Sequence, residues 1–295
     1  MNDHWVEKEM YNMDLGDKRL EKRCKKILGC FAQAPLSPIN QACKNWAETK
    51  AAYRFFQNDK IKYQEITKAH HRATTQRANN TQKILAVQDT TYCTYATHPA
   101  TQGLCPISRI KNRKGKDIST MGLLVHSTLI LNDNGLPVGV GNQKIFSTVK
   151  KKSKKNSCKW IEALEQTVAQ FPDQRENIIT ICDREADMYD LFIKAHQLNT
   201  QLLVRACQNR KVNKSSTYSK KTGEKFWSLL ENKKPQGEIV IEVPRRKNQQ
   251  PRKAVCTIKF TEVTISPPLA HPQRNTKDRL CPDFPNAESA IYSIK

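Results

Sequence analysis

The sequence predicts a mixed α/β protein, in which a helical region precedes a mixed sheet and a second β-rich region follows it. Helical spacing of apolar residues dominates positions 1–68, and strand-like alternation replaces it from about position 82. The elements then follow the order strand, strand, strand, helix, strand, helix, strand. A strictly alternating order would favour a parallel sheet, so this order favours a mixed sheet with flanking helices.

The first helix is predicted in LGDKRLEKRCKKILGCFA, residues 15–32, with Asp17, Lys18 and Arg19 at its start. Its apolar residues fall on one face and basic residues surround them. Pro35 and Pro38 then interrupt the chain. A second helix is predicted in NWAETKAAYRFFQND, residues 45–59, whose aromatic cluster is expected in the core, as is usual at helical spacing: Trp46, Tyr53, Phe55 and Phe56.

Strands of the sheet are predicted in ILAVQDTTY, MGLLVHSTLIL and LPVGVGNQKI, and the turn Asn132-Asp133-Asn134-Gly135 joins the last two as a hairpin. An apolar stripe in CKWIEALEQTVAQF predicts a helix, and NIITIC reads as a buried strand. After a helix that follows Asp183, QLLVRA predicts another strand. Residues from about 207 turn basic and polar around strand-like segments such as AVCTIKFTEVTI, which indicates an inserted β region.

The composition points to a polyanionic partner. Lys and Arg outnumber Asp and Glu by 50 to 28, which gives a formal charge of +22. A nucleic acid fits this field best, through phosphate neutralisation and counterion release, and an anionic membrane surface is the weaker alternative. No run of 18 apolar residues occurs and the first residues lack the apolar segment of a signal peptide, so we expect a cytoplasmic protein that does not enter a membrane.

The ten cysteines form no CxxC pair and no zinc-binding pattern, so free thiols are expected. Cys182 and Cys256 lie in predicted strands, where cysteine acts as a small hydrophobic residue. His126 alternates with apolar neighbours and is expected in the core rather than at a metal. The pair His70-His71 is expected on a linker or at an exposed helix end.

Two aspartates stand out because each follows an apolar strand: Asp89 after ILAVQ and Asp183 after IITIC. If these strands are neighbours, the two carboxylates meet, and a divalent cation would compensate their repulsion. Carboxylate oxygens suit Mg²⁺ or Mn²⁺, and two such ions support phosphodiester chemistry. The alternative remains open that Asp183 only caps the following helix and that Asp89 belongs to a turn with Thr90 and Thr91.

The segment DREAD, residues 183–187, occurs together with five other motifs: ILAVQDTT, MGLLVHSTLIL, LLVRACQNRK, LGDKRLEKR and WAETKAAYRFF. Along the chain, the six motifs stand in the order found in one family of enzymes. In these motifs the chain resembles the bacterial cut-and-paste DNA transposases of insertion sequences, over nearly its whole length. The resemblance implies a ribonuclease-H-like core with an Asp-Asp-Glu triad, acting in the cytoplasm on nucleoid DNA. Residues 1–68 would be a helical DNA-binding domain for terminal inverted repeats, 69–206 the catalytic core and 207–295 a β-rich insertion.

The resemblance further implies that Asp89 and Asp183 bind Mg²⁺ or Mn²⁺ and catalyse DNA cleavage and strand transfer, as a homodimer on paired ends of double-stranded DNA. Arg184 and Glu185 would support the site, although such a pair at a helix start is equally a local ion pair. The family's third carboxylate lies on a later helix with the pattern Tyr-x-x-Arg-x-x-x-Glu-x-x-x-x-x-x-Lys, which this sequence lacks. We therefore expect a C-terminally truncated core, with an inactive DNA-binding protein or inhibitor of the intact enzyme as the alternative.

Two groups of cations are candidates for contacts to the DNA backbone. The first crowds one predicted helix more densely than solubility requires: Lys18, Arg19, Lys22, Arg23, Lys25 and Lys26. The second follows the strand in LLVRACQNRK and would lie near the carboxylates: Arg205, Arg210 and Lys211. For the second group a solvated loop is an equal alternative.

Overall fold

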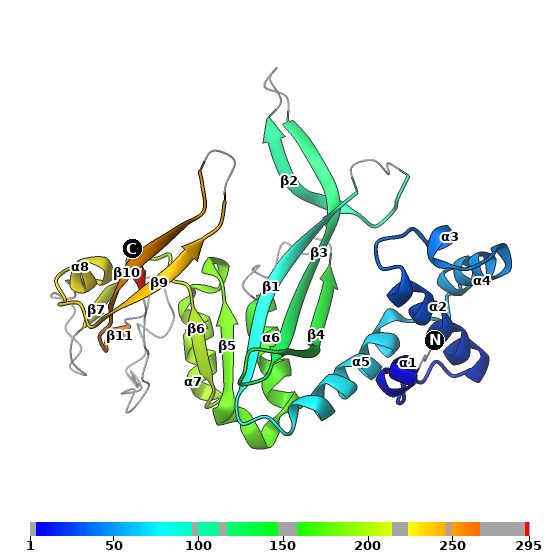
Figure 1. The fold of residues 1–295 in the computed structure, drawn as a ribbon, viewed down its shortest axis with the longest axis horizontal. Helices are drawn as coiled ribbons and strands as arrows, with labels where there is room; N and C mark the ends of the chain where they lie inside the picture. Colours follow the sequence, from blue (N-terminus) through cyan, green and yellow to red (C-terminus); the bar gives the residue numbers. More distant parts are fainter. Residues whose placement is uncertain are drawn as a thin grey trace, which may run out of the picture. The chain divides into compact units, whose positions relative to one another are not determined.

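The computed structural model describes residues 4–95, 100–111, 117–146, 158–213, 224–245, 249–265 and 293–294. The chain divides into two compact units (Figure 1). Unit 1 comprises Met1–Cys182 and Asp190–Leu202, and unit 2 comprises Asp183–Tyr189 and Leu203–Lys295. The residues after Ile265, which bear on the expected truncation of the core, lie outside the described residues, apart from positions 293–294.

Unit 1 begins with a helical region, as predicted: α1 (His4–Glu9), α2 (Lys18–Gln33), α3 (Ile39–Ala42), α4 (Trp46–Phe56) and α5 (Tyr63–Ala78). Asp17 starts α2 because its side chain accepts a hydrogen bond from the Arg19 backbone N–H, and Asn45 starts α4 in the same way through Glu48 N–H. Helix α5 continues past position 68 to Ala78, and five residues separate it from the first strand of the sheet, which begins at Ile84.

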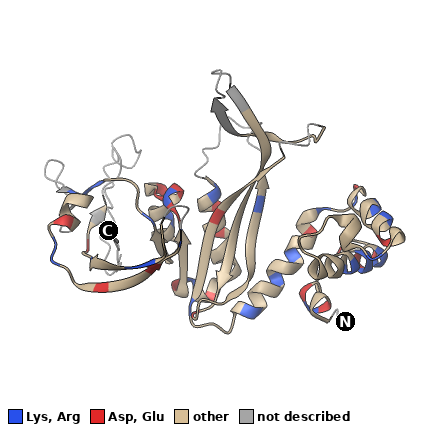
Figure 2. Cartoon of the chain, turned by 45° about the horizontal axis from the view of Figure 1, so that its top comes forward, with Lys and Arg blue, Asp and Glu red and all other residues tan. Residues whose placement is uncertain are grey.

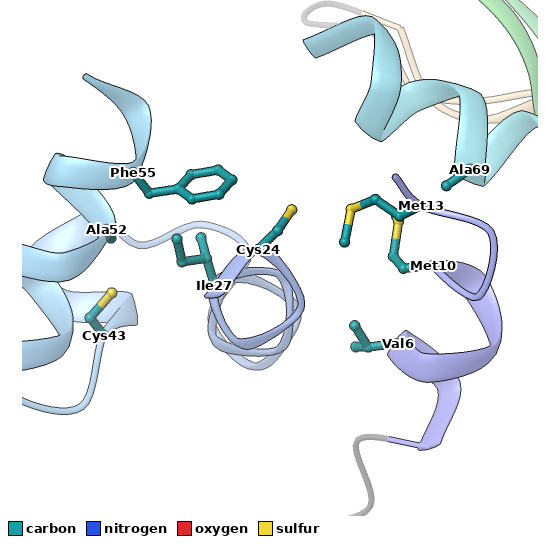
Figure 3. Close-up of a cluster of buried hydrophobic side chains, with 9 residues drawn as sticks. All are labelled: Val6, Met10, Met13, Cys24, Ile27, Cys43, Ala52, Phe55 and Ala69. Carbon is teal, nitrogen blue, oxygen red and sulfur yellow. The ribbon is translucent and has the colours of Figure 1, made fainter. Parts of the chain in front are cut away.

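The helical region has its own core (Figure 3). Cys24 and Ile27 of α2 lie in the middle of it, between side chains of α4 on one side and of α1 and the segment after it on the other. Ala69 joins the core from α5. Burial of this apolar stripe, which the sequence predicted, holds α1, α2, α4 and α5 together.

The aromatic residues of α4 correct the sequence prediction. Phe55 is buried, but Trp46, Tyr53 and Phe56 are 75%, 46% and 53% exposed. Only one stripe of an 11-residue helix can face the core, and Ala52 and Phe55 occupy it. Phe56 instead stacks on Phe31 at the edge of the core.

The sheet of unit 1 has the strand order β2-β3-β1-β5-β6, with β4 paired to β3. Its strands are β1 (Ile84–Thr94), β2 (Cys105–Lys111), β3 (Asp117–Leu131), β4 (Pro137–Phe146), β5 (Ile178–Cys182) and β6 (Gln201–Val204). Strand β1 pairs antiparallel with β3 and parallel with β5, so the mixed sheet is confirmed. The predicted hairpin joins β3 to β4, with Gly135 at a positive φ of 75°. Strand β2 was not predicted, because Pro106 interrupts its pattern and the pairing shifts there.

One face of the sheet packs against α6 (Cys158–Gln170), whose Trp160 and Leu164 are fully buried. His126 is 1% exposed, its Nδ1 lies 2.9 Å from the Thr90 hydroxyl and its ring packs edge-on against Trp160, so its predicted core position is confirmed. Asn142 of β4 donates to the Thr167 hydroxyl of α6 at 3.0 Å. Burial of the Asn142 amide is thus compensated by a hydrogen bond from the sheet to the helix layer. The short helix η2 (Pro172–Asn177) leads from α6 to β5, and α7 (Tyr189–Gln197) leads to β6.

Unit 2 contains mostly short strands in its described part. It contains η3 (Arg184–Ala186), β7 (Lys211–Asn213), β8 (Glu224–Lys225), α8 (Phe226–Glu231), β9 (Gly237–Val243), β10 (Arg252–Lys259), β11 (Thr264–Ile265) and β12 (Ser293–Ile294). Its strands form two sheets with the orders β12-β10-β9 and β11-β7-β8. Helix α8 was not predicted, since six residues are too few to show a period, and its Phe226, Leu229 and Leu230 form a small core with Val212.

All nine described cysteines are free, and Cys182 and Cys256 are buried, as expected. No helix in the described part of the chain is both long and apolar enough to span a bilayer.

Candidate functional site

The six cations predicted on α2 have different environments. Arg23 and Lys26 both form ion pairs with Glu48 of α4, at 3.0 and 2.5 Å, and Lys25 pairs with Glu7 of α1 at 2.5 Å. Lys18 pairs with Glu21 within the helix. Arg19 is 94% exposed with only a long contact of 3.7 Å to Asp17, and Lys22 is exposed. Half of the predicted cations therefore also hold helices together.

Glu48 is the carboxylate that fastens α2 to α4. The hydrogen bond from Lys26 is the main cause that lowers the pKa of Glu48; burial opposes it, and the charges of Lys26 and Arg23 add to the lowering. Glu48 is therefore ionised at neutral pH, and it keeps Arg23 in place between the two helices.

A basic groove runs between α2 and α4, with a volume of about 510 Å³. Its lining includes the cations Arg19 and Arg23 from α2 and Lys50 and Arg54 from α4. The buried ring of Phe55 belongs to the same lining. Figure 2 shows Lys and Arg gathered along these N-terminal helices. A groove with cations on both walls is suited to a phosphate backbone.

The exposed face of α4 extends this surface. Trp46, Lys50, Tyr53 and Arg54 follow each other at helical spacing and are all exposed. Sequence reasoning left Lys50 and Arg54 out of the site. Their spacing of four residues on a helix with Trp46 was the signal, and it was missed because the aromatic residues were expected in the core.

The two candidate metal-binding aspartates, Asp89 and Asp183, each come directly after one member of a residue pair in neighbouring strands. The parallel register of β1 and β5 ends with Gln88 opposite Cys182, and the next residue in sequence is an aspartate in both cases: Asp89 within β1 and Asp183 just after β5. Asp89 is exposed on β1, where it pairs with Ser127 of β3. Asp183 is exposed at the start of η3 and accepts the Glu185 backbone N–H at 2.9 Å. The capping role that the sequence left open for Asp183 is thus present.

Capping uses one lone pair of the Asp183 carboxylate, and an ionised carboxylate offers about four acceptor positions. The remaining oxygen sites of Asp183 and the exposed carboxylate of Asp89 are hard donors of the kind that Mg²⁺ and Mn²⁺ prefer. Arg184 and Glu185 are exposed in η3. Within the described ranges no group of three or more His, Cys, Asp or Glu side chains is placed to hold a metal ion.

Residues 2–61 match the family model described as transposase DNA-binding. The chain carries a transposase DNA-binding domain. This domain contains α1 to α4 and therefore the whole basic groove. The match supports DNA as the partner of these helices, as the charge and the sequence motifs predicted.

The predicted cations of unit 2 also differ from one another. Arg205 and Lys211 are exposed. Arg210 is only 17% exposed and pairs with the buried carboxylate of Asp187, and it also donates to the Asp187 carbonyl at 2.6 Å. Asp187 in turn accepts the backbone N–H groups of Cys207 and Gln208 at 2.6 and 2.8 Å. Arg210 therefore has a structural partner in addition to its proposed role at DNA.

Proposed function

We propose that this protein is a DNA transposase, which binds the terminal inverted repeats of a mobile element through the α2–α4 groove and cleaves and joins DNA strands at Asp89 and Asp183. The observation that carries the proposal is the basic groove within the matched DNA-binding domain. The mixed sheet, in which β1 lies between an antiparallel and a parallel neighbour, supports a ribonuclease-H-like core.

In the DNA-binding step, the four groove cations neutralise phosphates and release counterions. Arg23 is pre-oriented by Glu48, so it loses little side-chain freedom when DNA binds. Lys50 and Arg54 project from the same helix as Trp46 and Tyr53. The cations position the duplex, and the exposed aromatic side chains supply apolar contacts to sugars or base edges.

In the catalytic step, Asp89 and Asp183 would hold Mg²⁺ or Mn²⁺, which activates a water or a 3′ hydroxyl and stabilises the leaving oxygen when bound. Asp183 is held in orientation by its bond to Glu185 N–H. Arg184 and Glu185 support the site, and Arg205 and Lys211 contact the DNA backbone beside it. Two copies act together, one on each end of the element.

The proposal is tested first by DNA retention. A Lys50→Ala, Arg54→Ala variant removes two groove cations, and a matched Lys62→Ala, Lys68→Ala variant removes two exposed cations outside it. The groove variant should bind a repeat-end duplex about tenfold or more weakly, because charge-assisted hydrogen bonds to phosphates are lost. Equal weakening by both variants would mean that only net charge matters.

The same proteins are then incubated with labelled repeat-end DNA and Mn²⁺, together with an Asp89→Ala, Asp183→Ala variant. Wild-type protein should nick the DNA at the element boundary and the aspartate variant should retain the DNA without nicking it. Retention by both with no metal-dependent nicking by either would exclude the catalytic part of the proposal and leave the binding part.

A second candidate is a DNA-binding protein that does not cleave. It is favoured by the fact that the groove is built from side chains between Arg19 and Asn58 alone and uses nothing from the sheet. Such a protein would occupy transposon ends or form mixed complexes with an active transposase. The nicking experiment separates it from the first candidate.

A further inference from the structure

Strand β4 forms an edge of the sheet in the described part of the chain, where it pairs only with β3. An edge strand has outward-pointing N–H and C=O groups that need partners. Helix α5 supplies them here. The His70 ring accepts the Val140 backbone N–H at Nε2 (3.0 Å), and Arg77 Nε donates to the Val138 carbonyl at 2.8 Å.

The residue between these two contacts is Gly139, and its geometry shows how closely α5 approaches the strand. A Cβ atom at Gly139 would overlap the Thr74 hydroxyl and lie 2.9 Å from Arg77 Nη2. Its φ of +151° is also a conformation that favours glycine. Thr74 itself is completely buried. The contact between α5 and β4 therefore depends on a residue without a side chain at this position.

The two side chains that hold β4 are themselves held by one carboxylate of the DNA-binding domain. Glu9, the last residue of α1, accepts a hydrogen bond from His70 Nδ1 at 2.5 Å and from Arg77 Nη1 and Nη2 at 2.6 and 3.1 Å. The Glu9 side chain is only 14% exposed. With Nδ1 donating to Glu9, Nε2 is free to accept from Val140, so the two contacts of His70 require each other.

Burial by itself would raise the pKa of Glu9, but the hydrogen bonds and charges of Arg77 and His70 outweigh it and lower the pKa below its usual range. Glu9 is therefore ionised when the contact forms. The partners lie 61 and 68 residues away in sequence, so the ionised carboxylate joins separate parts of the fold rather than one local turn.

We propose that Glu9, His70 and Arg77 are positioning residues that hold the DNA-binding domain at a fixed orientation to the sheet through β4. DNA bound on α2 and α4 is then presented in a set register to the strand that carries Asp89. This inference rests on the proposed function for its purpose, but the coupling itself can be measured without any catalytic activity.

The first measurement is amide hydrogen exchange at Val140, resolved by fragmentation mass spectrometry. Glu9→Gln should raise exchange at Val140 about five- to tenfold, since a hydrogen bond contributes about that factor to an opening equilibrium. The matched control is Glu65→Gln, which removes a carboxylate of α5 that pairs only within the helix, with Lys68 at 2.7 Å. The control should leave Val140 unchanged. Equal exchange in all three proteins would overturn the coupling.

A second variant distinguishes local loosening of β4 from a general loss of stability. Arg77→Lys keeps a charge beside Glu9 but removes the Nε donor to Val138, and it should loosen β4 while the amides of α6 keep their protection. If both variants raise exchange throughout α6 and β1 as well, the three residues serve only global stability and the inference is wrong.

The functional measurement compares DNA affinity with the position of nicking. None of the three residues lines the basic groove, so Glu9→Gln should bind the repeat-end duplex within about twofold of wild type, as expected for additive distant sites. Its nicks should spread over several positions, whereas Glu65→Gln should nick at one. Undisturbed nicking positions in Glu9→Gln would overturn the positioning role. If wild-type protein does not nick, the catalytic proposal fails, and Val140 exchange still decides the coupling.

Discussion

At the scale of single residues, the two aspartates of the segment 183–187 have opposite environments. Asp183 is exposed and its carboxylate accepts a hydrogen bond from Glu185 N–H, which leaves further oxygen positions for a ligand. The Asp187 side chain is 2% exposed, and its carboxylate is used by two backbone N–H groups and by Arg210. An exposed carboxylate is suited to binding a metal ion, and a buried one with three donors is suited to fixing the fold.

His71, next to the positioning residue His70, gives the fold a pH dependence. Burial is the main cause that lowers the pKa of His71 from 6.5 to about 4, and the charge of His70 adds to it. Because the unfolded chain binds this proton more readily, the free energy of unfolding should fall as the pH is lowered from about 6.5 towards about 4.

Denaturant unfolding at several pH values checks this expectation. His71→Gln should flatten the dependence between pH 6.5 and about 4.5, and an unchanged slope would contradict it. Glu9 acts in a different range. Its pKa is lowered from 4.5, so its contribution is complete above pH 4.5 and is lost only as the pH falls below that value.

At the scale of elements, Asp187 joins η3 to the segment that leads into β7. Cys207, Gln208 and Arg210 all bond to it, so the chain between β6 and β7 is fixed to the end of η3. We expect Asp187→Ala to lower the free energy of unfolding by about 3–5 kcal/mol, because the buried Asp187 carboxylate is removed from its ion pair with Arg210 and two backbone N–H groups lose their acceptor. Asp183→Ala should cost only about 0.5–2 kcal/mol, the usual range for loss of a cap.

Chemical denaturation of both variants beside wild type measures the difference, with Asp173→Ala, a change at an exposed aspartate of η2, as the control. Similar small losses for Asp183→Ala and Asp187→Ala would show that the Asp187 contacts contribute little. The stability measurement is also a control for the nicking experiment, since loss of nicking in a stable Asp183→Ala protein cannot be attributed to unfolding.

The basic residues of helices α2 and α4 have different environments. Lys25 and Lys26 form ion pairs with acidic residues of neighbouring helices, whereas Lys50 and Arg54 line the groove. The helix with fewer cations thus contributes as much to the groove as the helix with more. Density of basic residues in sequence therefore does not show which cations are held in ion pairs and which line the groove.

At the scale of the whole molecule, the formal charge of +22 favours attraction to any DNA, and in our proposal the groove adds a defined contact. Plots of log K against log salt concentration separate the two. The slope for the Lys50→Ala, Arg54→Ala variant should be smaller than that of wild type by about 2, since each phosphate contact contributes about 0.9. The Lys62→Ala, Lys68→Ala control should keep the wild-type slope. Identical slopes for wild type and the groove variant would place the phosphate contacts elsewhere.

The sequence by itself determined α2, α4, α6 and the strands β1, β3, β4 and β5, because periodicity, caps and the Asn-Gly turn are local signals. It also indicated a DNA-binding region, which the matched domain at residues 2–61 confirms. Asp89 and Asp183 were predicted from the apolar segments before them and from the family resemblance, and their role at a metal ion stays a prediction. The structure places Asp89 within β1 rather than at its end.

Only the tertiary structure decided which charges are free and which are paired. Arg23 meets Glu48 across 25 residues, and Arg77 meets Glu9 across 68, so no local pattern could show that the one helps to fasten helices and the other holds a sheet edge. The exposure of Trp46 and the contact of His70 with β4 were decided in the same way. Periodicity predicts that a residue lies on a helix, but whether it faces solvent, a carboxylate or a strand depends on what packs beside that helix.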